Sequence, residues 1–200
     1  MSPASSVLVV CTANVCRSPS GGLLLQPPGG GSALAVTTAG TRSTAGARYC
    51  PLAAGLLGGT AVDLLDGHRS RALSREDLER ADLVLVMERR HRSSVAALLP
   101  GAATRTFTLR EAAHLADAPG PLSVAGGELA TVVSALNAAR GTLPTPEVPT
   151  AGWSARLRRR PPVHPFDIPD PHTDDHTSHE AALELVASSV ARVRALLGLG

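Results

Sequence analysis

Near the start of the chain, a short apolar run passes directly into a loop of small and polar residues. Residues 6–10 read SVLVV, whose β-branched and apolar side chains are typical of a buried strand. The loop reaches Pro19, and the apolar residues 23–25 indicate a helix that the Pro/Gly-rich stretch at 26–32 keeps short. A strand that turns into a helix across such a loop is typical of sheets covered by helices.

Strand-like and helix-like segments alternate along the rest of the chain. Residues 81–87 (ADLVLVM) form the clearest buried strand, 33–38 a second one and 104–108 a weaker candidate. Helices are predicted at 51–57, 74–81 with Ser74 as the N-cap, 95–99, 109–115, 128–139 and 181–197. This alternation predicts a single α/β domain over 1–200, a three-layer sandwich with a short, about four-stranded parallel sheet. The Pro/Gly-rich residues 116–165 predict a loop and helix insertion within it.

Composition disfavours several classes of function. Aromatic residues make up only 2% of the chain, too few for the stacking platforms that bind nucleobases. All basic residues are arginines, and the net charge of +2 is too small to indicate binding to nucleic acid or a membrane. No apolar run approaches the roughly 20 residues that cross a bilayer, and no basic residue precedes the apolar stretch at 7–10. We therefore expect a cytoplasmic protein.

The loop after the first strand combines groups suited to phosphate chemistry. Cys11 and Arg17 are separated by five residues, and the hydroxyl of Ser18 follows. The N–H groups of a loop that closes at a helix N-terminus point inward and, with the helix dipole, bind a dianion, while the Arg17 guanidinium matches phosphate oxygens. The same positive field favours a thiolate at Cys11, to which Ser18 can donate a hydrogen bond. These residues predict a nucleophilic sulfur that faces a bound phosphoryl group.

Residues 9–20, VVCTANVCRSPS, resemble the signature of the low-molecular-weight protein tyrosine phosphatases, Cys-x-x-Asn-x-Cys-Arg-Ser-Pro after the first strand. Residues 37–41 resemble the family's Ser-Ala-Gly-Thr turn and 68–71 its His-x-x-Arg segment, and the resemblance covers roughly 7–115 and 166–197. It implies hydrolysis of phosphotyrosine through a cysteinyl-phosphate intermediate, without a cofactor or a metal. The implied substrate is a phosphorylated protein such as a tyrosine kinase, and the implied state is a monomer or a weak homodimer.

The resemblance also implies roles for individual residues. Cys11 would be the nucleophile and Arg17 the phosphate-binding arginine. The remaining loop residues implied to bind phosphate are Thr12, Ala13, Asn14, Val15, Cys16 and Ser18. A hydrogen-bond network that holds the loop in shape would consist of Asn14, Ser18, Thr38 and His68. Thr38 stands where serine is usual, so its additional methyl group needs space.

A general acid is implied in an Asp-Pro loop late in the chain. The segment FDIPDP at 166–171 resembles that loop and places the acid at Asp170, directly before Pro171. Protonation of the leaving oxygen accelerates ester cleavage by typically about 10²- to 10⁴-fold, and the carboxylate left behind can activate water. Asp167 is the competing assignment.

Two positions leave the substrate class open. His172 stands where the family usually carries an aromatic residue beside the substrate ring. Within the resembled family, threonine at the position of Val15 is associated with protein arginine phosphatases. Valine instead leaves an apolar wall that suits an aryl ester. Three functions besides phosphotyrosine hydrolysis therefore stay open: protein arginine phosphatase activity, arsenate reduction, and binding of phosphate or phosphopeptide without catalysis. Arsenate reductases of this fold need additional downstream cysteines to relay a disulfide, and here only Cys50 lies beyond the loop.

The two other cysteines and the late histidines have simpler interpretations. Cys16 is either a small buried apolar residue or a partner that traps oxidised Cys11 as a disulfide. Cys50 is predicted to be inert. The polar segment at 172–179 contains three histidines and two aspartates, and a polar N-terminal turn of the last helix explains it more simply than a metal site.

Overall fold

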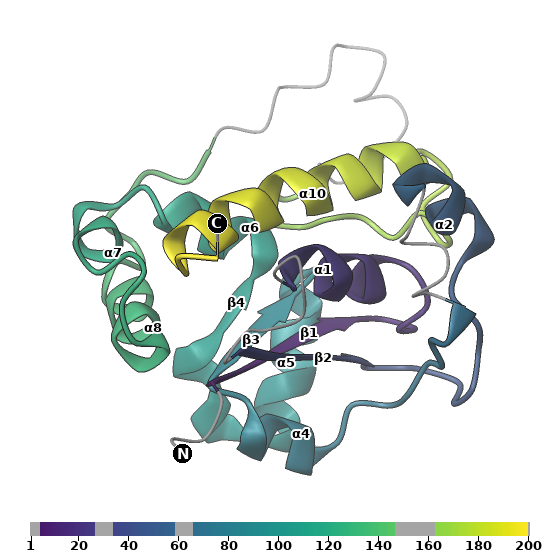
Figure 1. Ribbon diagram of the computed structural model, residues 1–200, viewed down its shortest axis with the longest axis horizontal. Helices are drawn as coiled ribbons and strands as arrows, with labels where there is room; N and C mark the ends of the chain where they lie inside the picture. The colour runs from purple at the N-terminus through teal and green to yellow at the C-terminus, as the bar shows by residue number, and fades with distance from the viewer. Residues whose placement is uncertain (1–4, 27–33, 59–65, 147–162, 200) are drawn as a thin grey trace.

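A four-stranded parallel sheet lies at the centre of the computed structural model, which describes residues 5–26, 34–58, 66–146 and 163–199 (Figure 1). The strand order is β2-β1-β3-β4. The strands are β1 (Ser5–Cys11), β2 (Leu34–Gly40), β3 (Leu83–Val86) and β4 (Thr106–Thr108). The predicted strands and the predicted sheet are confirmed, and Cys11 ends the central strand opposite Gly40.

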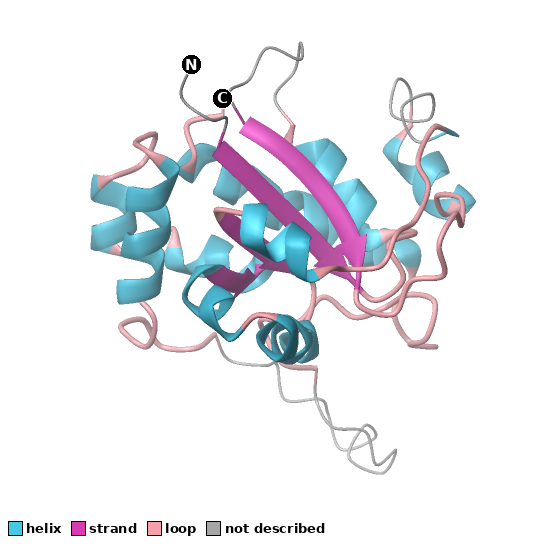
Figure 2. Cartoon of the chain, turned by 90° about the horizontal axis from the view of Figure 1, so that it is seen from below, coloured by secondary structure: helices cyan, strands magenta, loops and turns pink. Residues whose placement is uncertain are grey.

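Helices cover both faces of this sheet (Figure 2). Along β1, Val7 and Val9 face one layer of helices while Leu8 and Val10 face the other, and all four are fully buried. Burial on both faces explains why the strand is a continuous apolar run rather than an alternating one. The three-layer α/β sandwich is therefore confirmed.

The helices divide between the two layers. The helices that pack on the Val7 and Val9 face are α1 (Arg17–Leu25), α6 (Leu109–Leu115), α8 (Leu129–Ala138) and α10 (His179–Leu196). The other face is covered by α4 (Arg75–Arg80), α5 (Arg89–Leu98) and the 3₁₀ helix η1 (Pro100–Arg105). Two shorter helices are α2 (Pro51–Leu57) and α7 (Pro119–Ser123). None of the described helices is long and apolar enough to span a bilayer.

Side-chain caps fix where several of these helices begin, α4 and α10 among them. The Ser74 hydroxyl accepts a hydrogen bond from the Asp77 N–H, and the Asp77 carboxylate accepts one from the Ser74 N–H, so α4 begins with a reciprocal capping box. Ser178 caps α10 by accepting from the Ala181 N–H. The apolar stripe predicted for the last helix is buried against the sheet layer, which confirms its amphipathic character.

The segment predicted as an insertion contributes to the core as far as the structure describes it. Leu129, Val132 and Leu136 of α8 belong to the same apolar cluster as the sheet. Arg140, just after α8, lies with its guanidinium carbon 3.9 Å from the centre of the Phe107 ring. Residues 147–162 lie outside the described part of the chain, so the insertion at 116–165 stays a prediction.

Two glycines allow α1 to pack closely on the sheet. A side chain at Gly22 would place its Cβ 2.6 Å from the Cγ2 methyl of Thr38, and one at Gly21 would lie 3.2 Å from the Met87 methyl. Thr38 cannot simply rotate away, because its hydroxyl accepts a hydrogen bond from Asn14. The space that the Thr38 methyl requires is therefore provided by Gly22.

This pairing predicts a strong coupling between positions 22 and 38. Gly22→Ala alone should lower the free energy of unfolding by about 1–3 kcal/mol through overpacking. In the Thr38→Ser background the methyl is absent, and the same change should raise stability by up to about 1 kcal/mol because alanine favours a helix. Urea unfolding of the two single variants and the double variant measures the coupling; additive effects would contradict the proposed contact.

Candidate active site

The candidate site lies at the carboxyl ends of the parallel strands, in the loop that joins β1 to α1. In open α/β sheets, ligands bind outside these ends, where neighbouring crossovers diverge. The end of β2 approaches the loop so closely that a Cβ at Gly40 would lie 2.7 Å from the Thr12 carbonyl oxygen and 2.9 Å from the Asn14 nitrogen. Only glycine at position 40 lets β2 and the loop share this edge.

Asn14 holds the loop in an unusual backbone conformation. Its φ of 57° is the only positive φ among the described non-glycine residues. Its side-chain oxygen accepts from the Arg71 N–H at 3.0 Å, which directs the amide nitrogen toward the hydroxyls of Ser18 and Thr38 at 3.0 and 2.9 Å. Its carbonyl oxygen accepts from His68 Nε2 at 2.7 Å. The four residues expected to form the network thus meet at Asn14, with Ser18 and Thr38 at its side chain and His68 at its backbone carbonyl.

Two donors converge on the sulfur of Cys11. The Asn14 N–H lies 3.2 Å from Cys11 Sγ, and the Ser18 hydroxyl lies 3.0 Å from it. Because the Ser18 oxygen accepts from the Asn14 amide, its own hydrogen is available for the sulfur. This arrangement stabilises a negatively charged sulfur.

Arg17 is buried at the beginning of α1, with 1% of its surface exposed. Its Nη1 donates to Glu88 Oε1 at 2.6 Å and to the Ile168 carbonyl at 2.7 Å. Its Nη2 donates to Thr12 Oγ1 at 3.2 Å and forms an ion pair with Asp170. A buried guanidinium between two carboxylates is held in one orientation at the mouth of the loop.

The two candidate acids have different partners. Asp170 is buried beside Arg17, and its other oxygen accepts from the His172 N–H at 3.2 Å. Asp167 accepts from the Arg89 N–H at 2.7 Å, at the first residue of α5, and its carboxylate lies 3.4 Å from Arg89 Nε. The structure therefore brings Asp170 to the loop and places Asp167 at the beginning of a helix.

Comparison with known proteins gives the family. The family model described as low molecular weight phosphotyrosine protein phosphatase matches residues 6–145. The chain belongs to this family. The chain is 34% identical over 119 residues to the low molecular weight protein-tyrosine-phosphatase Etp of Escherichia coli, a match that covers 58% of this chain and 77% of Etp.

The chain is also similar to a phosphatase that is named for phosphoarginine rather than phosphotyrosine. The chain is 33% identical over 108 residues to a protein-arginine-phosphatase of Geobacillus stearothermophilus, covering 52% of this chain and 69% of that protein. Among solved structures, the tyrosine phosphatase Wzb of Escherichia coli K30 in complex with phosphate matches with a TM-score of 0.60 and 22% identity, over 98% of this chain and 94% of that one. This likeness shows that the fold is shared.

Two residues of this candidate site, Glu88 and His91, escape sequence-based prediction. The Glu88 N–H donates to His91 Nδ1 at 3.1 Å, so the neutral ring carries its hydrogen on Nε2 and donates it to Thr12 Oγ1 at 3.1 Å. Burial, together with Arg17 and Arg90, lowers the pKa of His91 to about 3. The signal available in the sequence is the place of Glu88, just beyond the carboxyl end of β3, where site residues of parallel sheets gather.

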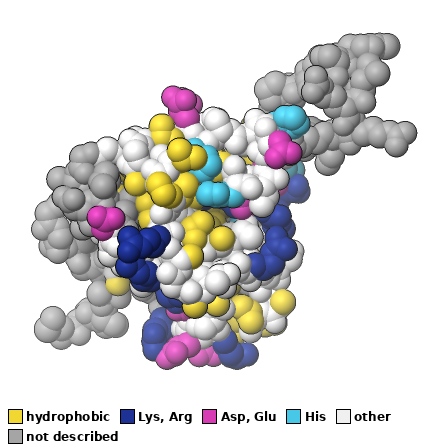
Figure 3. Space-filling view, turned by 90° about the vertical axis from the view of Figure 1, so that its right-hand side faces the viewer, with side chains coloured by type: hydrophobic (Ala, Val, Ile, Leu, Met, Phe, Trp, Pro, Cys, Tyr) yellow, Lys and Arg dark blue, Asp and Glu magenta, His cyan; other side chains and the backbone are white. Residues whose placement is uncertain are grey.

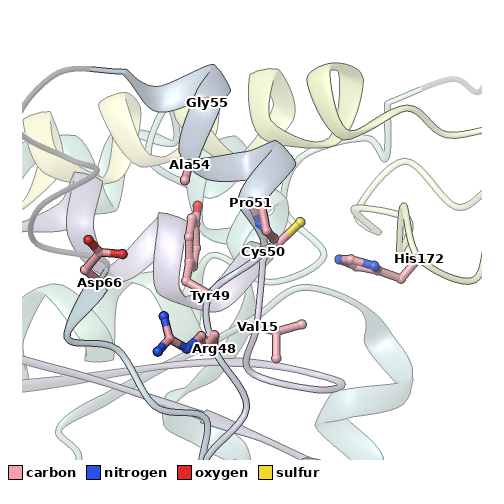
Figure 4. A pocket seen from close by; sticks show the side chains of 9 residues that line it. All are labelled: Val15, Arg48, Tyr49, Cys50, Pro51, Ala54, Gly55, Asp66 and His172. Atoms are coloured by element: carbon pink, nitrogen blue, oxygen red, sulfur yellow. The ribbon is translucent and has the colours of Figure 1, made fainter.

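A cavity of about 630 Å³ opens beside the loop (Figure 4). Its lining includes Val15, Tyr49 and Pro51, with Cys50 and His172 at one side. On the face of the molecule that bears α2, apolar side chains lie beside histidines and are flanked by arginines (Figure 3). The cavity is thus a largely apolar recess that begins at the anion loop and reaches the residue two positions after Asp170.

The remaining loop residues have mainly structural contacts. The carbonyl of Ala13 accepts from the Ser43 hydroxyl at 2.9 Å, and that of Val15 accepts from the Cys50 N–H at 2.7 Å. The Cys16 side chain is buried in a cluster with Tyr49 and Cys50. Burial, and the neighbouring thiols, raise the pKa of Cys16. All three cysteines are free thiols.

The lowered pKa of His91 predicts a defined loss of stability in mild acid. Above pH 6.5 the ring is neutral in both folded and unfolded chains, whereas below it only the unfolded chain binds the proton until the pH approaches about 3. Folding should therefore lose about 2 kcal/mol between pH 6.5 and 5 through this residue. His91→Gln should remove that part of the slope in urea unfolding at several pH values; an unchanged slope would show that His91 titrates normally.

Proposed function

We propose that this chain hydrolyses phosphotyrosine in proteins through a cysteinyl-phosphate intermediate. The observation that carries the proposal is the sulfur of Cys11, which receives two hydrogen bonds at the foot of a loop that Arg17 and Asp170 face. Membership of a family of cysteine-dependent phosphatases agrees with it. The proposed chemistry uses side chains of this chain alone.

In the first step, the phosphoryl group binds in the loop, and a phosphoryl oxygen replaces the Asp170 carboxylate at Arg17 Nη2. The negative charge of the bound group favours the protonated form of the adjacent Asp170 carboxyl. The Cys11 thiolate then attacks phosphorus in line, the bond from phosphorus to the tyrosine oxygen breaks, and Asp170 gives its proton to that oxygen. The products of this step are a neutral tyrosine side chain and a cysteinyl phosphate.

In the second step, water attacks the phosphorus of the cysteinyl phosphate. The Asp170 carboxylate takes a proton from this water, and the bond between phosphorus and sulfur breaks. The departing thiolate regains the hydrogen bonds from the Asn14 N–H and the Ser18 hydroxyl, which make it a better leaving group. Arg17 holds the equatorial oxygens in both steps, where negative charge is redistributed.

The apolar recess supports an aromatic leaving group. Val15 and Tyr49 line it without a buried acidic group that would pair with a guanidinium, and Asp66, the carboxylate among the lining residues, is exposed. A flat aryl ring gains more from such a wall than a charged phosphoarginine side chain does.

We place this activity in the cytoplasm, where the substrate would be a phosphorylated protein such as a tyrosine kinase. The enzyme would act as a monomer or a weak homodimer.

Two substitutions test the roles of the cysteine and the acid. Cys11→Ser should abolish turnover of an aryl phosphate while inorganic phosphate still binds. Asp170→Asn should lower kcat by about 10²- to 10⁴-fold on a substrate with a poor leaving group. Asp167→Asn is the matched control and should retain nearly full activity, because Asp167 contacts Arg89. Equal losses in both aspartate variants would contradict the assignment of Asp170.

The order of alkylation tests the ionised sulfur separately. At neutral pH, iodoacetate should modify Cys11 faster than Cys16 or Cys50, and inorganic phosphate should protect Cys11 specifically. Both results follow from a thiolate inside an anion-binding loop. Peptide mass mapping of the modified cysteines gives the readout.

Substrate preference tests the role of Val15. The kcat/KM for a phosphotyrosine peptide should exceed that for the matching phosphoarginine peptide, and Val15→Thr should lower it by about tenfold or more. Val15→Ile keeps the wall apolar and should change it much less. A preference of the unaltered chain for phosphoarginine would show that the recess does not select an aryl group.

The same assays distinguish hydrolysis from arsenate reduction and from binding without catalysis. Arsenate reduction at the expense of thiols, lost in Cys50→Ser while aryl phosphate is not turned over, would establish a reductase. Phosphopeptide binding without any turnover would establish a non-catalytic module. Either result would replace the proposed hydrolysis.

A further inference from the structure

Four side chains with metal-binding atoms converge beside the anion loop. They are Cys16, Cys50, His172 and His179, and among the described residues their ligand atoms all lie within 4.8 Å of one another. They come from four segments of the chain: the loop, the residue before α2, the segment after Asp170, and the first residue of α10. Figure 4 shows the sulfur of Cys50 on the side that faces the His172 ring.

The geometry is close to a tetrahedral site. The Nε2 atoms of His172 and His179 lie 3.4 Å apart, and their rings are almost perpendicular, at 87°. Zinc–nitrogen bonds of about 2.0–2.1 Å in a tetrahedron require a nitrogen–nitrogen edge of about 3.3 Å, and zinc–sulfur bonds of about 2.3 Å require a sulfur–sulfur edge of about 3.8 Å. The largest separation of 4.8 Å exceeds these edges by about 1 Å, which side-chain rotation can close.

We propose that Cys16, Cys50, His172 and His179 bind one zinc ion. Two thiolates and two imidazoles are the donor set of structural zinc sites, and soft sulfur ligands disfavour magnesium and calcium. Two thiolates with two neutral imidazoles also balance the charge of Zn²⁺, which suits a site whose two cysteines are buried. Binding releases the two thiol protons to solvent, and no atom changes oxidation state.

The sequence alone favours a different interpretation of each ligand. Cys50 is predicted to be inert, and the histidines at 172–179 are predicted to belong to a polar helical turn. The fold changes both predictions, because it brings His172 and His179 to the sulfur atoms of Cys16 and Cys50. His176, which belongs to the same polar segment, is not part of the cluster.

Such an ion would connect two parts of the proposed phosphatase site, the anion loop and the segment that follows Asp170. Cys16 lies directly before Arg17, and His172 follows Asp170 by two positions. Coordination would fix the segment of the acid against the anion loop. It would also withhold the Cys16 thiolate from a disulfide with oxidised Cys11. The site does not depend on the proposed hydrolysis, since its ligands are defined by geometry and chemistry alone.

Metal binding can be measured without any assay of turnover. The reduced full-length chain, stripped of metal with a chelator, is titrated with Co²⁺, whose tetrahedral thiolate complexes have intense visible bands and sulfur-to-cobalt charge-transfer absorption. We expect one ion per chain, displaced by one equivalent of Zn²⁺. The absence of stoichiometric uptake, or the weak spectrum of an octahedral complex, would overturn the proposal.

Variants establish which residues bind the ion. Cys50→Ser, His172→Ala and His179→Ala should each weaken Co²⁺ binding by more than about 100-fold, since even loss of groups that merely orient ligands costs about 10- to 100-fold. His176→Ala and Cys11→Ser are matched controls and should bind as the unaltered chain does. His172 is exposed, so its replacement keeps the test valid if Cys50→Ser does not fold. Equal affinity in all variants would show that the ion binds elsewhere.

Protection from alkylation provides an independent readout. Zn²⁺ should protect Cys16 and Cys50 from iodoacetamide while Cys11 remains reactive, and it should raise the Tm of the unaltered chain but not of His172→Ala. Protection of Cys11 instead would place the ion at the nucleophile. A disulfide between Cys16 and Cys50 in the chain as purified, with no metal bound after reduction, would also overturn the proposal.

Discussion

The backbone conformation of Asn14 is the constraint on which the site depends. A left-handed residue in the middle of the loop turns the chain so that the Asn14 N–H meets the sulfur of Cys11. An asparagine can hold this conformation because its side chain is bound on every side, by Arg71, Ser18 and Thr38. The direction of the amide group in turn decides the direction of the Ser18 hydrogen, so one side chain determines both donors to the sulfur.

Charge balance explains the groups around Arg17. The guanidinium is almost completely buried. Burial of an unpaired charge costs roughly several kcal/mol, even after the surrounding protein relaxes. Glu88 and Asp170 compensate for it, while the neighbouring His91 is kept neutral by burial and by the nearby arginines. Glu88 pairs with Arg17 Nη1 and also with Arg90, whereas Asp170 pairs with Arg17 Nη2, so Asp170 is the carboxylate proposed to exchange with a phosphoryl group. The Asp170 side chain thus pairs with Arg17 in the free chain and, in the proposed mechanism, acts as the acid once the phosphoryl group has taken its place.

The strands, most of the helices and the anion loop follow from the sequence because their signals are local. Residues 6–10 form a strand through apolar side chains, and Ser74 begins α4 through its own hydroxyl. The contacts that escape prediction are long-range. The pairing of Gly22 with Thr38 and the position of Glu88 beside Arg17 depend on how strands and helices pack. Cys16 and His179 are separated by most of the chain, and their proximity requires α10 to return across α1.

The apolar recess and the proposed metal site share Cys50 and His172, so a bound ion would fix two residues of the recess wall. An imidazole at position 172 offers less apolar area to a substrate ring than a larger aromatic side chain would, and an unrestrained ring loses rotamer entropy when it packs on a ligand. A bound ion would orient His172 before substrate arrives and remove that loss. Since coupling between two binding sites is reciprocal, any gain in substrate affinity from the ion equals the gain in metal affinity from the substrate. The same side chain would then line the recess and bind the ion.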